Sequence, residues 1–219
     1  MAKNADPIYF AVLNFVRYGV FLPFGGVRVL HGERMPMSGP VILAANHASF
    51  ADPPVVAVST NRRLNFMAKA ELFKPPVFGP LIRRIGAFPI QRDVADTAAV
   101  KHTLALLADG EAVLVFPEGG RGDGKTLGEA NKGVTLLAMK SGAPVLPVGI
   151  AGTHLWLPQG AKFPRRARLT VAFGEPFTFS AVEGRHGKDA RNAFGDILME
   201  KIAELVREGG QEVSVFSEP

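Results

Sequence analysis

Long apolar runs alternate with helical segments along this chain, and this alternation sets the strongest limit on its fold. Three runs have the unbroken hydrophobicity of strands buried on both faces: residues 39–47 (GPVILAANH), 111–120 (EAVLVFPEGG) and 143–152 (APVLPVGIAG). Residues 96–110 and 129–142 lie between them, show helical periodicity and each end at a glycine. Alternation of this kind favours a parallel sheet with helices packed on it.

The remaining segments extend this pattern over most of the chain. Shorter strands are predicted at 26–33, 64–70, 87–92 and 167–176, and further helices at 52–60, 78–85 and 189–210. With 219 residues and 47% hydrophobic composition, the chain can bury one core but is short for two domains. We therefore expect a single α/β domain over residues 25–219, with a mostly parallel central sheet flanked by helices. An N-terminal amphipathic helix within residues 1–24 is expected to precede it.

The N-terminal segment, PIYFAVLNFVRYGVFLPFGG, is apolar and aromatic with a small polar face. Asn14, Arg17 and Tyr18 share one side of a helix at this spacing, and the rest is mainly Ile, Phe, Val and Leu. The fifteen residues between Pro7 and Pro23 would form a helix of about 22 Å, shorter than the hydrocarbon core of about 30 Å. We expect this helix to lie in the plane of a membrane interface. The alternative is that it packs on the protein's own core.

Chemically capable side chains follow three of the predicted strands. His47, Arg92 and Glu118 each stand where a strand ends. In sheets of this class, ligands gather beyond the carboxyl ends of the strands. These residues are therefore candidates for one shared site.

His47 and Asp52 have the residue types of a base and its orienting carboxylate. A neutral imidazole takes a proton from a hydroxyl near neutral pH, and a carboxylate on its other nitrogen fixes the tautomer. Five residues across a strand-to-helix turn bring the two side chains within hydrogen-bond reach. Asp52 precedes Pro53, so a simple helix cap is the alternative. No G-x-S-x-G elbow accompanies the pair, which favours direct attack by a substrate hydroxyl or by water.

Residues 115–126, VFPEGGRGDGKT, form a glycine-rich loop that suits a phosphate. Backbone amides together with Arg121 and Lys125 provide donors of the kind that a phosphate monoester requires. Residues 119–126 also match the phosphate-binding loop of nucleotide triphosphatases, G-x-x-x-x-G-K-T, which leaves a nucleotide-binding protein as an alternative. That interpretation leaves His47 and Asp52 without a role, and no later strand ends in an aspartate that would hold magnesium.

The cysteine content limits the kinds of site that this chain can hold, and its net charge indicates the kind of partner that it binds. The absence of cysteine excludes disulfides, thiolate zinc sites and a cysteine nucleophile. The net charge of +5 indicates an anionic partner, and the stretch from Arg62 to Arg92 is rich in Lys, Arg and Phe with a single acid, Glu71. This stretch is either a solvated basic face or a surface for anionic lipid or the phosphates of a carrier.

Taken in order, four blocks resemble the glycerolipid acyltransferase family, which includes bacterial 1-acylglycerol-3-phosphate acyltransferase. NHASFAD (46–52) is similar to the family's N-H-x-x-x-x-D signature, GAFPIQR (86–92) to its second block, FPEGGR (116–121) to F-P-E-G-T-R, and APVLPVGI (143–150) to its apolar fourth block. The matched span covers about residues 40–150, and FGEP at 173–176 fits the usual tail. Four blocks in the right order are a far more specific signal than any one of them.

The resemblance implies a role for each matched residue. His47 is the general base and Asp52 orients it. The acceptor-phosphate region is formed by Arg92, Glu118, Gly119 and Arg121, and Pro147 shapes the acyl or acceptor pocket. One departure concerns the acceptor: Gly120 stands where the family usually has Thr or Ser, which removes one hydroxyl donor.

The implied activity is transfer of a fatty acyl group from acyl-CoA or acyl-ACP to a lysophospholipid hydroxyl, with phosphatidic acid as the leading product. No metal and no permanently bound cofactor are implied. The expected partners are the lysophospholipid, the acyl thioester, with acyl carrier protein as one of its two carriers, and an anionic membrane surface, without nucleic acid. The expected location is the cytoplasmic face of the cell membrane, as a peripheral or monotopic protein. Alternative acceptors are glycerol 3-phosphate, another lysophospholipid or a glycolipid. A membrane-binding module with a decayed site is a further alternative.

Overall fold

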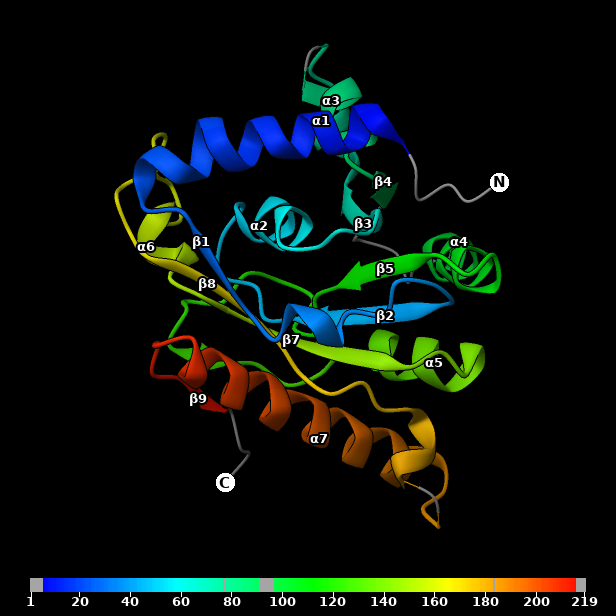
Figure 1. Ribbon diagram of the computed structural model, residues 1–219. Coiled ribbons are helices and arrows are strands. Elements are labelled where there is room, and N and C mark those ends of the chain that lie inside the picture. The colour runs from blue at the N-terminus through cyan, green and yellow to red at the C-terminus, as the bar shows by residue number, and fades with distance from the viewer. Residues whose placement is uncertain (1–5, 77, 91–96, 183, 216–219) are drawn as a thin grey trace.

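The computed structural model describes residues 6–76, 78–90, 97–182 and 184–215, and its centre is a seven-stranded sheet (Figure 1). The strand order is β1-β8-β7-β2-β5-β3-β4. The strands are β1 Val27–Leu30, β2 Val41–Ala45, β3 Leu64–Lys69, β4 Ala87–Ile90, β5 Ala112–Val115, β7 Val145–Ala151 and β8 Leu169–Phe173. The strands from β7 to β4 in this order are all parallel; β8 is antiparallel to β7, and β1 pairs in parallel with β8. The expected mostly parallel α/β sheet is confirmed.

Helices cover both faces of the sheet, which gives three layers. The α-helices are α1 Pro7–Phe15, α2 Asp52–Val58, α3 Phe78–Arg84, α4 Thr97–Ala108, α5 Lys132–Ser141, α6 Thr153–Trp156 and α7 Gly187–Glu208. One core lies under α1 and α2 and the other under α4, α5 and α7. β2 is buried throughout and feeds both cores, with Val41 and Leu43 on one side and Ile42 and Ala44 on the other. This alternation explains why the strand is a continuous apolar run.

The N-terminal helix is longer than expected. It runs without a break from Pro7 to Phe24, because α1 continues into a π-helical stretch, Val16–Phe21, and a final 3₁₀ turn that accommodates Pro23. Its 18 residues correspond to a length of about 27 Å, which is close to the thickness of the hydrocarbon core of a bilayer, about 30 Å. By length and composition alone it qualifies as a membrane-spanning helix, the one helix in the described part of the chain that does.

This helix is also anchored to the core along one side. The Asp6 carboxylate caps it by accepting the amides of Ile8 and Tyr9. Tyr9 is buried, and its hydroxyl accepts the amide of Leu64 at 3.1 Å, where β3 begins. The remaining faces are largely exposed. The alternative of packing on the protein's own core thus holds for one side of the helix, and the expected place at a membrane interface stays a prediction.

One residue of the basic stretch is not on any surface. Arg62 is 1% exposed, and its guanidinium donates to the carbonyls of Pro36, Gly39 and Gly110. Burial lowers the pKa of Arg62, with the charge of Glu111 opposing that effect. The expected basic face therefore does not include Arg62, because its buried guanidinium links separate loops through hydrogen bonds to their carbonyls.

A second, two-stranded sheet directly follows the glycine-rich loop and was not expected. It pairs β6, Thr126–Leu127, with β9, Ser214–Val215, close to the C-terminal end of the described chain. Gln211 strengthens this connection, since its side chain donates to the carbonyl of Gly124 and accepts the amide of Gly152. The glycine-rich loop is thus supported from the far end of the sequence.

Candidate active site

His47 and Asp52 contact each other where β2 ends. The ring Nδ1 of His47 lies 2.7 Å from Oδ2 of Asp52, and both residues are buried. With the proton on Nδ1 donated to the carboxylate, Nε2 carries the lone pair that accepts a substrate proton. This is the arrangement of a general base and its orienting acid.

Asp52 holds a whole turn as well as the imidazole. It is the first residue of α2, and its Oδ2 also accepts the amides of Ala48 and Ser49 at 2.7 and 2.8 Å. The residue at the cap position is Ala51, so Asp52 does not act as a simple cap. Backbone donors on the carboxylate keep its position fixed.

The backbone of His47 is attached to the glycine-rich loop at both its amide and its carbonyl. Oε1 of Glu118 accepts the amide of His47 at 2.8 Å, and Oε2 accepts the amide of Gly128 at 3.1 Å. The amide of Gly122 donates to the carbonyl of His47 at 2.7 Å. Burial raises the pKa of the Glu118 carboxyl, and the hydrogen bonds from the amides of His47 and Gly128 partly oppose the rise. Both oxygens of Glu118 are therefore occupied by protein amides.

Phe116 supports the imidazole from its flat side. The two rings stack at 4.0 Å between centroids with an interplanar angle of 21°. Phe116 comes directly after β5, which neighbours β2 in the sheet. The expectation that residues after adjacent strands meet is borne out for His47 and the loop that carries Glu118.

Asn46 has a role that the sequence did not reveal. Its side-chain oxygen accepts the amide of Ile150 at 2.7 Å, and its side-chain nitrogen donates to the carbonyl of Ile150 at 2.9 Å. The side chain thus continues the pairing of β2 with β7 beyond the end of β2. The available signals were its place directly before His47 at the strand end and its position as the first residue of the NHASFAD block.

Arg121 of the glycine-rich loop contacts the turn that carries His47. Its guanidinium carbon is 3.7 Å from the centre of the Phe50 ring, a close cation–π stack. Phe50 is exposed and comes from the turn between His47 and Asp52. The stack places a guanidinium beside the turn that carries His47. Nothing in the sequence indicated a function for Phe50.

The two central glycines of the loop differ in their surroundings. Gly119 has φ +69°, and a Cβ there would come within 2.9 Å of the Asn131 side chain. Gly120 is not in the left-handed region, and a Cβ there would meet nothing within 4 Å. Glycine is thus required by conformation at 119 but not at 120.

The loop does not have the geometry of a nucleotide-triphosphatase loop. Asp123 Oδ1 accepts the amides of Lys125 and Thr126, so these two amides do not face an open cradle. Thr126 begins β6, and the next helix, α5, starts only at Lys132. The nucleotide-binding alternative therefore lacks the direct loop-to-helix junction that it needs.

Two further expected site residues, Arg92 and Pro147, stay predictions. Arg92 lies outside the described residues. Pro147 lies inside β7, where it shares a sheet face with Gly149, which packs against Leu205 of α7. Its expected contribution to a substrate pocket stays a prediction that no contact here supports.

His154 lies on the other side of the loop. It is half-buried in α6, and a Cβ on Gly124 would come within 2.6 Å of its ring. Burial lowers the pKa of His154, with the charge of Asp52 opposing the shift. Its Nδ1 has no hydrogen-bond partner among the residues that the structure describes. No cluster of His, Asp and Glu suited to a metal ion is found within that same part of the chain.

Known proteins are similar to this chain in sequence and in fold. A family model described as Acyltransferase matches residues 27–151. A 1-acyl-sn-glycerol-3-phosphate acyltransferase of Bacillus subtilis is 26% identical over 83% of this chain and 88% of its own length. A lyso-ornithine lipid O-acyltransferase of Rhizobium meliloti is 30% identical over 87% of this chain and 60% of its own. The crystal structure of the LPA acyltransferase PlsC from Thermotoga maritima has a TM-score of 0.77 and 26% identity, covering 100% of this chain and 86% of that one.

Proposed function

Because this chain belongs to the Acyltransferase family, we propose that it transfers a fatty acyl group from an acyl thioester to the hydroxyl of 1-acylglycerol-3-phosphate. The observation that carries the proposal is the 2.7 Å contact between His47 and Asp52, which lies within the matched span. The donor is acyl-CoA or acyl-ACP, and the product is phosphatidic acid. Family membership alone supports the acylation of a lysophospholipid.

The chemistry needs one proton carrier and no covalent enzyme intermediate. Nε2 of His47 takes the proton of the acceptor hydroxyl while the oxygen bonds to the thioester carbonyl carbon. The tetrahedral adduct expels the thiolate, which takes the proton back from the imidazolium. One C–O bond forms, one C–S bond breaks, and the products are an ester and a thiol. Asp52 stabilises the imidazolium between the two steps.

The acceptor phosphate is proposed to bind at the glycine-rich loop. Arg121 provides the guanidinium, and its stack on Phe50 holds it beside the turn between His47 and Asp52. Glu118 contributes by positioning rather than by contact with substrate, since both its oxygens accept backbone amides. Gly119 allows the turn that the loop takes there, and Arg92 remains a candidate for the same phosphate.

A second acceptor is favoured by a specific residue. Gly120 lacks the hydroxyl that the family pattern places beside the phosphate, and one relative acts on a lyso-ornithine lipid. Ornithine lipids carry an amino-acid head group in place of phosphate. We keep a lyso-ornithine lipid as the alternative acceptor for this site.

The N-terminal helix is proposed to hold the site at the cytoplasmic face of the membrane. Exposed apolar side chains repeat along it at helical spacing: Ile8, Phe15, Tyr18 and Leu22. Its other side is packed on the core, so the stripe and the site form one body. A lysophospholipid resides in the bilayer, and a membrane-facing stripe brings the site to it.

One assay tests the proposed function. The purified chain is given acyl-CoA or acyl-ACP with 1-acylglycerol-3-phosphate, lyso-ornithine lipid or glycerol 3-phosphate, and thiol release is measured. We expect thiol release only with a lipid acceptor and none with His47→Ala. Release that is independent of acceptor, or that survives His47→Ala, would reject the proposal. A matched variant, His186→Ala, replaces an exposed histidine and should leave the rate unchanged.

A further inference from the structure

A basic loop with an exposed phenylalanine follows the short helix α6. It consists of residues 157–166 (LPQGAKFPRR) and contains no acid. Phe163 is 79% exposed, the highest value among the large apolar side chains that the structure describes. Its neighbours Lys162, Arg165 and Arg166 are exposed as well. An exposed aromatic ring flanked by cations is typical of a surface that binds an anionic membrane.

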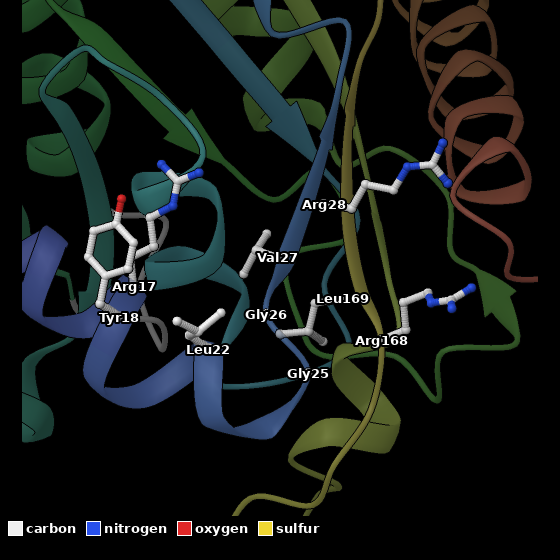
Figure 2. Close-up of a pocket in the computed structure, with 9 residues that line it drawn as sticks. All are labelled: Arg17, Tyr18, Leu22, Gly25, Gly26, Val27, Arg28, Arg168 and Leu169. Carbon is white, nitrogen blue, oxygen red and sulfur yellow. The ribbon is translucent and has the colours of Figure 1, made fainter.

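The two ends of the basic loop meet at α6, where the amide of Arg165 donates to the carbonyl of Trp156 at 2.7 Å. Leu155, the residue before Trp156, is 58% exposed and adds a second apolar side chain. Within the described part of the chain, no ion pair with a carboxylate involves the three cations of the loop. Arg168, which follows the loop, extends away from the N-terminal helix in Figure 2 and is not counted among them. Unpaired cations beside exposed apolar side chains suit a lipid surface better than a face built only for solubility.

The basic loop is joined to the end of the N-terminal helix. The amide of Ala167, directly after the loop, donates to the carbonyl of Phe24 at 3.1 Å. The ring of Trp156, directly before the loop, lies 5.1 Å from the ring of Phe21 between centroids. Figure 1 shows this part of the chain, in yellow, beside the end of the helix. The exposed apolar stripe of the helix extends to Leu22 in its last turn, so the stripe and the loop are neighbours.

The basic loop is also hydrogen-bonded to the candidate active site. The side-chain nitrogen of Gln159 donates to the carbonyl of Gly122 at 2.9 Å, and the amide of Gly122 donates to the carbonyl of His47. The hydroxyl of Ser49, in the turn that follows His47, donates to the carbonyl of Leu157 at 2.9 Å. Two residues of the basic loop thus hold the glycine-rich loop and the turn that carries the base.

We propose that the basic loop docks on an anionic membrane leaflet, with Phe163 among the acyl chains and the three cations at the lipid phosphates. It acts beside the N-terminal helix and makes attachment depend on the charge of the lipid. An acidic protein is the other class of partner that cations attract, but the exposed ring and the contact with the helix favour the leaflet. The proposal rests on the proposed membrane attachment and requires neither the acceptor nor the chemistry at His47.

Binding to vesicles tests the cations of the basic loop. Vesicles of phosphatidylcholine alone, or of phosphatidylcholine with one-third phosphatidylglycerol, are titrated into the full chain, and the bound fraction is measured by sedimentation. In the variant Lys162→Gln/Arg165→Gln/Arg166→Gln, binding to the anionic vesicles should weaken about tenfold or more, and binding to the neutral vesicles should not change. Anionic-vesicle binding equal to that of the parent would overturn the proposal.

A matched variant removes the same charge elsewhere. Lys140→Gln/Arg185→Gln/Lys188→Gln replaces exposed cations on α5 and around the start of α7, on the other side of the molecule from α6 in Figure 1. This variant should bind both kinds of vesicle nearly as the parent does. Equal losses in the two triple variants would overturn the docking surface in favour of diffuse attraction by the net charge.

Insertion of Phe163 has its own measurement. Phe163→Trp, mixed with anionic vesicles whose acyl chains carry bromine, should show fluorescence quenching beyond that of the parent, whose single tryptophan, Trp156, is 4% exposed. Met37→Trp is the control, because Met37 is 60% exposed and precedes the start of β2, at the opposite end of that strand from His47. It should show no added quenching. Quenching in Phe163→Trp no greater than in Met37→Trp would overturn the insertion.

Acyl transfer in neutral detergent separates this inference from the proposed function. The loop variants should keep the parent rate there, because no leaflet has to be recognised. If neither the parent nor the variants transfer acyl groups while binding to anionic vesicles still depends on the basic loop, the proposed function fails and the docking surface stands. If acyl transfer is present and vesicle binding is independent of the loop, the reverse holds. A loop variant that binds vesicles as the parent does, but loses turnover with acyl-ACP and not with acyl-CoA, would replace the leaflet by an acidic carrier protein.

Discussion

The guanidinium of Arg121 lies over the ring of Phe50 with 3.7 Å between its central carbon and the ring centre. The two residues come from different signature blocks, and their contact joins the turn that carries His47 to the glycine-rich loop. An exposed cation–π pair contributes about 0.5–1 kcal/mol.

Replacement of Phe50 is therefore expected to affect acceptor binding more than chemistry. Phe50→Ala should raise the KM for 1-acylglycerol-3-phosphate about two- to fivefold at unchanged kcat. Steady-state kinetics at saturating acyl donor measures this. Phe50→Trp should restore the parent KM, and Phe50→Leu, which is apolar but has no π face, should not. A variant Phe50→Leu with the parent KM would show that apolar contact alone is sufficient.

Replacement of Asp52 separates charge from shape. Asp52→Asn is nearly isosteric, but it removes the charge that stabilises the imidazolium and changes which ring nitrogen carries the proton. We expect kcat to fall about 10²- to 10⁴-fold, with the KM for the acceptor little changed. Circular dichroism and thermal unfolding serve as controls for the fold, because Asp52 also accepts two amides. A folded variant with more than a tenth of the parent kcat would argue against the base assignment.

Gly120 offers a test of acceptor choice that leaves the fold intact. Since a Cβ at Gly120 meets nothing within 4 Å, Gly120→Thr should change stability by no more than about 0.5 kcal/mol. The new hydroxyl should raise kcat/KM for a phosphate acceptor relative to a lyso-ornithine lipid. Gly119→Thr is the contrasting variant: φ is +69° there, and we expect a loss of about 1–3 kcal/mol. Equal acceptor preference in Gly120→Thr and the parent would remove this residue from the specificity argument.

His154 should make the protein sensitive to mild acid. Burial lowers its pKa in the folded state, so the unfolded chain binds the proton more readily. This contribution to stability is complete above the unfolded pKa of about 6.5 and is lost as the pH falls below it. Burial acts with the opposite sign at Glu118, whose raised pKa favours the folded state at lower pH. Thermal unfolding of the parent and of His154→Gln between pH 8 and pH 5 isolates the histidine; parallel curves would contradict the expectation.

The sequence predicted contacts that lie close together along the chain. His47 and Asp52 are five residues apart and span one strand-to-helix turn, so local geometry alone determines that they meet. The alternation of strands and helices likewise predicted that His47 and the loop of Glu118 follow parallel neighbours. Local patterns and the rule for strand ends were sufficient for both.

The sequence did not predict contacts that depend on how distant segments pair. Asn46 forms hydrogen bonds with the backbone of Ile150, 104 residues away, and Arg62 donates hydrogen bonds to carbonyls of separate loops. The pattern of basic residues placed Arg62 on a surface because composition does not register burial. The length of the N-terminal helix was underestimated for a different reason: Pro23 stands at the start of the separate 3₁₀ turn Leu22–Phe24, a position that tolerates proline.

The attachment of the His47 backbone to the glycine-rich loop affects how this protein is inhibited. Glu118 and Gly122 both hold the peptide of His47, so a ligand that displaces either of them is expected to move His47 as well. On the proposed mechanism, a compound directed at the loop is expected to lower turnover without contacting the imidazole.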